Sequence, residues 1–181
     1  AAIEAAELVE KESLNAEDMK NAMNNLLLPR RINAIGTHED QFAGQAPAEG
    51  DFYLYNVGRK QFLKGAMNHI THCGVGFTAK PVTLHAVEGG YKINTHLPNG
   101  QDGVNDFMNY NGYMDCPDGD VWTFVPTSSG DGIYNIARAA DNSMLLGYRD
   151  GTYATVDTDM TDGSNPYNQW KLVTVADRYA L

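Results

Sequence analysis

Short apolar segments recur in the same order three times between residues 50 and 175. Each unit begins with an opening segment rich in aromatic and β-branched residues and continues through a polar turn into a middle segment. It ends, after a loop rich in Gly and Asp, in a closing segment of the form bulky-x-apolar. Because a unit that recurs about every forty residues decides the architecture, three such units predict a closed pseudo-threefold β structure. The opening segments are 52–55, 91–93 and 133–136, the middle segments are 60–63, 105–108 and 142–145, and the closing segments are 82–84, 122–124 and 170–172.

Turn signals separate these segments at short, regular intervals. Asn-Gly and Asp-Gly pairs such as Asn99-Gly100, Asp118-Gly119 and Asp162-Gly163 suit tight hairpins, since both residue types tolerate positive φ. No helical period lies between the strands, which excludes a parallel α/β fold. The pattern predicts an all-β barrel or sandwich.

The first 28 residues follow a helical pattern instead. Apolar stripes run along 2–9 and 19–27 at helical spacing, Asn15 can cap the second stripe, and Pro29 ends it. Residues 30–50 lose this period without a strand pattern replacing it. We therefore expect a helical segment and linker over residues 1–49 and a β domain over residues 50–181.

Composition and charge make some classes of binding partner unfavourable. The chain has 181 residues, of which 43% are hydrophobic, and its 13 Lys+Arg against 23 Asp+Glu give a formal net charge of -10. Repulsion disfavours nucleic acid and anionic membranes as partners. The sequence lacks a run of eighteen apolar residues, so no membrane insertion is expected. It begins at Ala1 without an initiator Met, which predicts a processed or excised chain with any export signal upstream.

Two strings carry a family resemblance. The run from Phe52 to Gly58 followed by Gln61-Phe62-Leu63, and the ending from Asn168 to Thr174, resemble the ricin-type β-trefoil (ricin B-like lectin) modules of secreted and surface proteins of bacteria. The resemblance covers residues 50–178 and implies a β-trefoil of twelve strands, six in a barrel and six in a cap. It also implies a carbohydrate-binding module, with a glycan as partner, within a larger exported multidomain protein.

The closing segments depart from the hallmark of that family. A Gln-x-Trp closer would place Gln two residues before the closing residue, where this chain has Lys80, Asp120 and Asn168. Only Asn168 keeps an amide that could brace a sugar-binding loop. The departure favours a competing hypothesis, a structural or protein-binding spacer without sugar binding.

Carbohydrate binding requires an exposed aromatic ring for the C–H face of a sugar and Asp, Asn or Gln for its hydroxyl groups. The same residue types are also ordinary turn and half-buried strand residues, which is the alternative for each one. The third unit is richest in the required mixture, and the second unit offers a smaller set. The predicted carbohydrate site is Asp141, Asn142, Tyr148, Asp150, Tyr153 and Asn168, and the second unit offers Asp106, Asn109, Tyr110, Asn111, Tyr113 and Asp115.

The sequence offers no complete metal, cofactor or catalytic motif. The acidic run 157–163 does not match the ligand spacing of a calcium loop, and His69-x-x-His72-Cys73 lacks a fourth ligand at a recognisable spacing. Cys73 and Cys116 are either two thiols or one disulfide. Nucleophile-elbow, HExxH and phosphate-loop motifs are missing. The sequence therefore predicts a non-catalytic module without a metal or cofactor.

Overall fold

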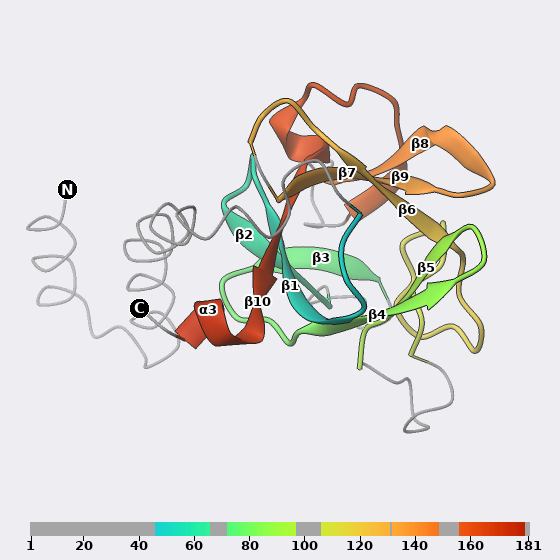
Figure 1. The fold of residues 1–181 in the computed structure, drawn as a ribbon, viewed down its shortest axis with the longest axis horizontal. Helices are drawn as coiled ribbons and strands as arrows, with labels where there is room; N and C mark the ends of the chain where they lie inside the picture. Colours follow the sequence, from blue (N-terminus) through green and yellow to red (C-terminus); the bar gives the residue numbers. More distant parts are fainter. Residues whose placement is uncertain (1–45, 66–71, 97–105, 131, 149–155, 180–181) are drawn as a thin grey trace, which may run out of the picture.

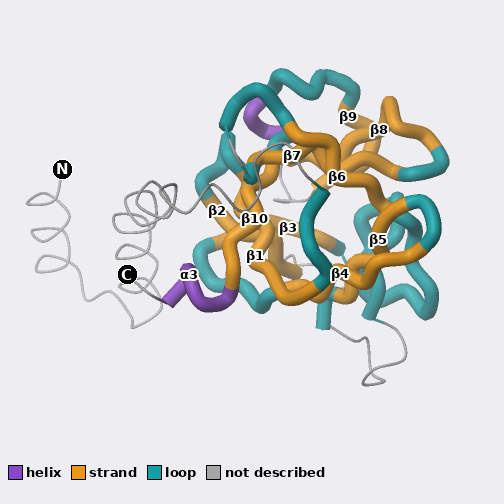
Figure 2. Tube along the Cα trace, in the orientation of Figure 1, coloured by secondary structure: helices purple, strands orange, loops and turns teal. Residues whose placement is uncertain are grey.

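The computed structural model describes residues 46–65, 72–96, 106–130, 132–148 and 156–179 (Figure 1). The helices predicted within residues 2–28 lie outside the described residues. Strands and loops make up nearly all of the described chain, as Figure 2 shows. The two short helices are η2 (Pro166–Asn168) and α3 (Val175–Tyr179).

Six strands form a closed antiparallel barrel. Each closing strand pairs with the opening strand of its own unit and with the opening strand of the next unit, and β10 closes the ring by pairing with β1. The predicted opening and closing segments are therefore confirmed as strands. The opening strands are β1 (Gly50–Asn56), β5 (Gly90–Asn94) and β7 (Ile133–Arg138), and the closing strands are β4 (Val82–Val87), β6 (Trp122–Pro126) and β10 (Trp170–Thr174).

Two hairpins extend this barrel. In the first unit β2 (Gln61–Gly65) pairs with β3 (Cys73–Gly76), and in the third unit β8 (Asp141–Tyr148) pairs with β9 (Val156–Met160). Figure 1 shows β8 and β9 side by side beyond β7. The middle segments of these two units are thus strands, as predicted.

The middle segment of the second unit is the exception. Phe107 makes only isolated bridges, to Asn94 and Cys116. The Asn109 side-chain oxygen accepts hydrogen bonds from the backbone N–H groups of Asn111 and Tyr113, at 3.0 and 3.1 Å. These side-chain bonds form a tight loop directly after Met108, and the backbone before it bonds only at single points to Ile93, Thr95 and Cys116. The described chain therefore has ten strands rather than twelve, and the expected β-trefoil over residues 50–178 is corrected to a closed six-strand barrel with two hairpins.

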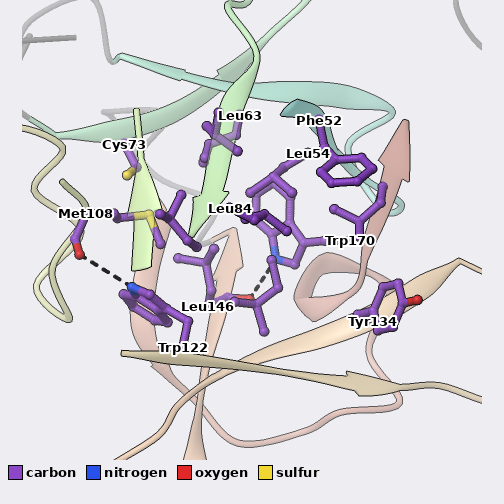
Figure 3. Close-up of a cluster of buried hydrophobic side chains, with 14 of the residues drawn as sticks. Phe52, Leu54, Leu63, Cys73, Leu84, Met108, Trp122, Tyr134, Leu146 and Trp170 are labelled. Carbon is purple, nitrogen blue, oxygen red and sulfur yellow. Dashed lines mark hydrogen bonds between the residues drawn. The ribbon is translucent and has the colours of Figure 1, made fainter. Parts of the chain in front are cut away.

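The closing strands contribute their bulky residues to one core. Trp122 and Trp170 are fully buried in the same cluster as Leu84 (Figure 3). The indole Nε1–H of Trp170 donates to the carbonyl of Leu146 at 2.8 Å, and that of Trp122 donates to the carbonyl of Met108 at 3.4 Å. Burial of each indole contributes about 4 to 6 kcal/mol of transfer free energy. These bonds also fix the chain two residues before Tyr110 and Tyr148.

A second, smaller cluster covers the other face of β1. Side chains alternate along a strand, so Leu54 enters the main core while Tyr53 and Tyr55 pack with Phe62 outside it. The guanidinium of Arg178 in α3 lies 4.9 Å from the Phe62 ring centroid and 5.8 Å from that of Tyr53. In the part of the chain that is described, no helix has the length and apolar character needed to cross a bilayer.

Candidate functional site

The predicted third-unit residues do not gather at one place. Asp141 and Asn142 are exposed at the start of β8, whereas Tyr148 is buried at its far end. Tyr148 lies seven positions after Asp141 along extended strand, a span of roughly 20 Å. Asp150 and Tyr153 lie outside the described residues. The six predicted residues therefore do not converge on a single pocket among those that can be placed.

Asp141 and Asn142 are engaged by their neighbours. The Asp141 carboxylate accepts from the Ser143 hydroxyl at 2.7 Å and from its backbone N–H at 3.1 Å, which lowers the pKa of Asp141. Asn142 Oδ1 accepts from the Thr123 hydroxyl at 3.2 Å. Asp141 thus stabilises the backbone at the start of β8, and Asn142 joins it to β6.

Asn168 is a bracing residue. Its side chain is buried, and Nδ2 donates to the carbonyl of Asp162 at 2.8 Å. Its Oδ1 is buried without a hydrogen bond and lies against the Cα of Gly147, where a Cβ would collide with it. Asn168 thus holds the loop from Asp162 to β10 against β8 and presents no polar atom to a ligand.

The second unit brings an exposed tyrosine and a carboxylate together. Tyr110 is 42% exposed, and its backbone N–H donates to Asp120 Oδ2 at 2.8 Å. Arg138 Nε donates to the other oxygen of Asp120 at 3.3 Å, and its guanidinium carbon lies 4.1 Å from the Tyr110 ring centroid. We call Tyr110, Asp120 and Arg138 the Tyr110 site.

A compact loop presents Tyr110. Asn109 and Tyr113 close the loop through a backbone bond of 2.9 Å, and the carbonyl of Gly112 accepts from the Cys73 N–H at 2.7 Å. The Tyr113 ring stacks on His72, with the centroids 3.9 Å apart. The loop is therefore fixed to the start of β3, and Tyr110 stands at its exposed turn.

A second arginine and tyrosine pair lies where the first and third units meet. The guanidinium carbon of Arg59 is 4.6 Å from the Tyr148 ring centroid, and the Tyr167 ring lies 6.3 Å from Tyr148. Arg59 is exposed, and Tyr167 is 41% exposed. We call Arg59, Tyr148 and Tyr167 the Arg59 site.

The two sites share one plan. In each, a core tryptophan donates to a carbonyl, Met108 or Leu146, and the tyrosine follows that carbonyl by two residues. In each, an arginine near the turn after an opening strand lies over that tyrosine. The repeated sequence therefore places a cation and an aromatic ring side by side twice.

Three polar side chains, those of Asp51, Thr83 and His96, form a hydrogen-bonded row across β1, β4 and the end of β5. The Thr83 hydroxyl lies 2.5 Å from Asp51 Oδ1 and 2.6 Å from His96 Nε2. A hydroxyl has one proton and a carboxylate only accepts, so Thr83 donates to Asp51 and His96 Nε2 donates to Thr83. In this arrangement His96 does not accept a proton from Thr83.

Metal and thiol chemistry were considered for the same residues. Within the described ranges, no group of three or more His, Cys, Asp or Glu side chains could hold a metal ion. His69 lies outside those ranges. Cys73 and Cys116 are free thiols, and burial raises the pKa of both above the usual value. A raised pKa keeps a thiol protonated and unreactive.

Sequence reasoning named Tyr110 but missed its partners. Arg138 and Arg59 each lie in the polar stretch that follows an opening segment. Arginine is not among the residue types, aromatic rings and Asp, Asn or Gln, that predict a sugar site from sequence. In the sequence, Asp120 stands out only as a departure from Gln-x-Trp. The signal that could have found them is the arginine that recurs after the first and third opening segments.

Comparisons with known proteins identify the fold but no family. No protein-family model matches the chain, and no curated protein matches it. Lysenin in complex with phosphocholine is similar in structure, with a TM-score of 0.53 and 16% identity over 70% of this chain and 44% of lysenin. The lysenin pore gives a TM-score of 0.54 and 16% identity over 73% and 49%. The chain thus spans less than half the length of the lysenin chains it matches.

A smaller protein matches along nearly its whole length. A salivary protein from Culex quiquefasciatus, of the cysteine and tryptophan-rich family, has a TM-score of 0.51 and 14% identity over 74% of this chain and 98% of that protein. At these identities the likeness shows the fold alone.

These findings overturn the resemblance to ricin-type lectin modules. The strings that carried it, in β1 and β10, consist of alternating bulky residues that pair with each other and fill the core. Any antiparallel barrel with aromatic closing strands needs such residues, so they do not specify that family. Lysenin and the salivary protein take its place as the similar structures.

Proposed function

We propose that this chain is a non-catalytic module that binds carbohydrate through the Tyr110 site. One observation carries the proposal: Tyr110 is exposed beside a carboxylate and a guanidinium that are already held in place. An aromatic ring next to fixed polar groups is the arrangement that sugar recognition requires. The proposal rests on these side chains and not on any family.

The groups match the two sides of a sugar. The open part of the Tyr110 ring suits the C–H face. The Asp120 oxygens each accept one protein hydrogen bond, which leaves a lone pair on each for a pair of sugar hydroxyls. Arg138 uses only Nε in its bond to Asp120, so its Nη–H groups remain as donors. Because Asp120 and Arg138 neutralise each other, the site favours a neutral ligand.

A protein ligand is the second candidate. Tyr110 is joined on the same loop by Tyr113, which is 37% exposed, and exposed tyrosine and arginine are enriched at protein interfaces. This candidate agrees with the spacer alternative. Export to a cell surface stays a prediction for either function.

The experiment that tests carbohydrate binding is a glycan array followed by calorimetry with the best neutral glycan. Tyr110→Ala should lower the affinity about tenfold, the worth of one aromatic contact. Tyr167→Ala is the matched control, since Tyr167 is equally exposed but belongs to the Arg59 site. It should leave the affinity within about twofold.

Two results would contradict the proposal. One is the failure of every glycan to bind at millimolar concentration, which would favour the protein ligand. The other is an equal loss in both variants, which would place the sugar away from Tyr110.

A further inference from the structure

Arg59 carries a charge that no carboxylate offsets in the described ranges. Its guanidinium stacks on Tyr148, and its backbone N–H donates to Asn56 Oδ1 at 2.9 Å. Stacking on an aromatic face leaves the N–H donors of a guanidinium in its own plane available.

The sequence explains why Arg138 has a carboxylate partner and Arg59 does not. Asp120, two residues before Trp122, neutralises Arg138. The same position before Trp170 is Asn168, whose amide is turned inward against Asp162 and Gly147. One plan therefore yields a neutral site in the second unit and a positive one at Arg59.

One buried side chain holds both exposed parts of the Arg59 site. Asn56 is fully buried, accepts from the Arg59 N–H, and donates through Nδ2 to the carbonyl of Tyr167 at 2.9 Å. The Gly58 N–H donates to the carbonyl of Pro166 at 2.9 Å. A Cβ at Gly58 would lie 2.6 Å from Tyr167 Cδ1, so the ring is seated directly on that glycine. Arg59 and Tyr167 are thus positioned before any ligand arrives.

We propose that the Arg59 site binds an oxyanion of the phosphate or sulfate class, as a free ion or as an ester. The guanidinium offers a planar fork of donors that matches such an anion. Tyr167, which is 41% exposed with its ring 6.3 Å from that of Tyr148, adds a phenolic O–H donor to the same site. The proposal is independent of carbohydrate binding because it uses different residues and an anionic rather than a neutral ligand.

The test is a titration with inorganic phosphate at low ionic strength, followed by the NMR signals of the arginine Nε–H groups. The Arg59 signal should move and saturate, while the Arg138 signal stays in place. Arg59→Gln should weaken binding at least about tenfold. Arg138→Gln is the matched control and should change it by less than about twofold.

Tyr167→Phe is a second variant, which tests the site in case Arg59→Gln weakens binding only by perturbing the fold. It keeps the ring on Gly58 and removes only the hydroxyl, so an intermediate loss of about threefold is expected, the worth of one hydrogen bond. Phosphate that binds equally well to wild type, Arg59→Gln and Tyr167→Phe would overturn the proposal. So would saturation of the Arg138 signal instead.

A vesicle assay separates the two sources of the anion. Phosphatidylcholine vesicles that contain phosphatidic acid present a phosphate monoester on a lipid surface, and vesicles of phosphatidylcholine alone are the control. If the chain sediments only with phosphatidic acid, and Arg59→Gln abolishes this, the anion is a lipid headgroup. If phosphate binds and the vesicles do not, the anion is soluble. If neither binds, the site is not an oxyanion site.

Discussion

At the scale of single residues, Asp120 and Asn168 separate the two binding sites. Both stand two residues before a core tryptophan, yet Asp120 reaches outward to Arg138 and Asn168 turns inward to Asp162. A carboxylate in the buried position of Asn168 would lie unpaired next to Gly147, at a cost of several kcal/mol. The amide is therefore required by packing, and the free charge on Arg59 follows from it.

Tyr55 provides a residue-scale prediction for stability. Burial raises the pKa of Tyr55 to about 12 from 10.0. A folded-state pKa above the unfolded value contributes stability below pH 10 that is lost as the pH rises toward 12. We expect Tyr55→Phe to match wild type within about 0.5 kcal/mol at pH 8.

Above pH 10 the stabilities of wild type and Tyr55→Phe should become different. The free energy of unfolding of Tyr55→Phe should rise relative to wild type, by at most about 1.4 kcal/mol per pH unit. Urea denaturation at intervals between pH 8 and 12 measures this difference. A difference that stays constant over that range would show that burial does not perturb Tyr55.

At the scale of elements, α3 depends on its cap. The Thr174 hydroxyl donates to Asp177 Oδ2 at 2.6 Å and accepts from the Asp177 N–H at 3.0 Å. A helix of five residues has little stability of its own, so this cap keeps Arg178 over Phe62.

We expect Thr174→Ala to lower the free energy of unfolding by about 1 kcal/mol. Hydrogen exchange of the Arg178 amide should become faster in the same variant. Val175→Ala, at an exposed neighbouring position, should change stability by less than about 0.5 kcal/mol. Equal effects in the two variants would mean that the cap does not hold α3 in place.

The strands were the most predictable elements, for a physical reason. Segments such as Trp122-Thr123-Phe124 alternate bulky and small residues, and only an extended chain places both bulky residues in one core. The middle segment of the second unit has a similar pattern but does not form a ladder strand. There, the backbone bonds at single points to Ile93, Thr95 and Cys116 instead of to one neighbouring strand, an arrangement that the apolar pattern does not record.

At the scale of the whole molecule, the barrel brings together residues that are distant in sequence. Arg59 meets Tyr148 because β10 closes the ring between β1 and β7. Such a contact depends on closure, so local patterns predicted the tyrosines but not the arginines that cover them. The predicted third-unit residues that can be placed are not brought together, since β8 carries Asp141 and Tyr148 at opposite ends.

One NMR titration on the wild-type chain tests the central claim, that two sites of one plan differ in ligand because they differ in charge. A neutral oligosaccharide is added first and inorganic phosphate second, and the Nε–H signals of Arg138 and Arg59 are followed. The account predicts that the sugar moves the Arg138 signal alone and that phosphate then moves the Arg59 signal alone. Movement of both signals with the same ligand, or of neither with any, would contradict it.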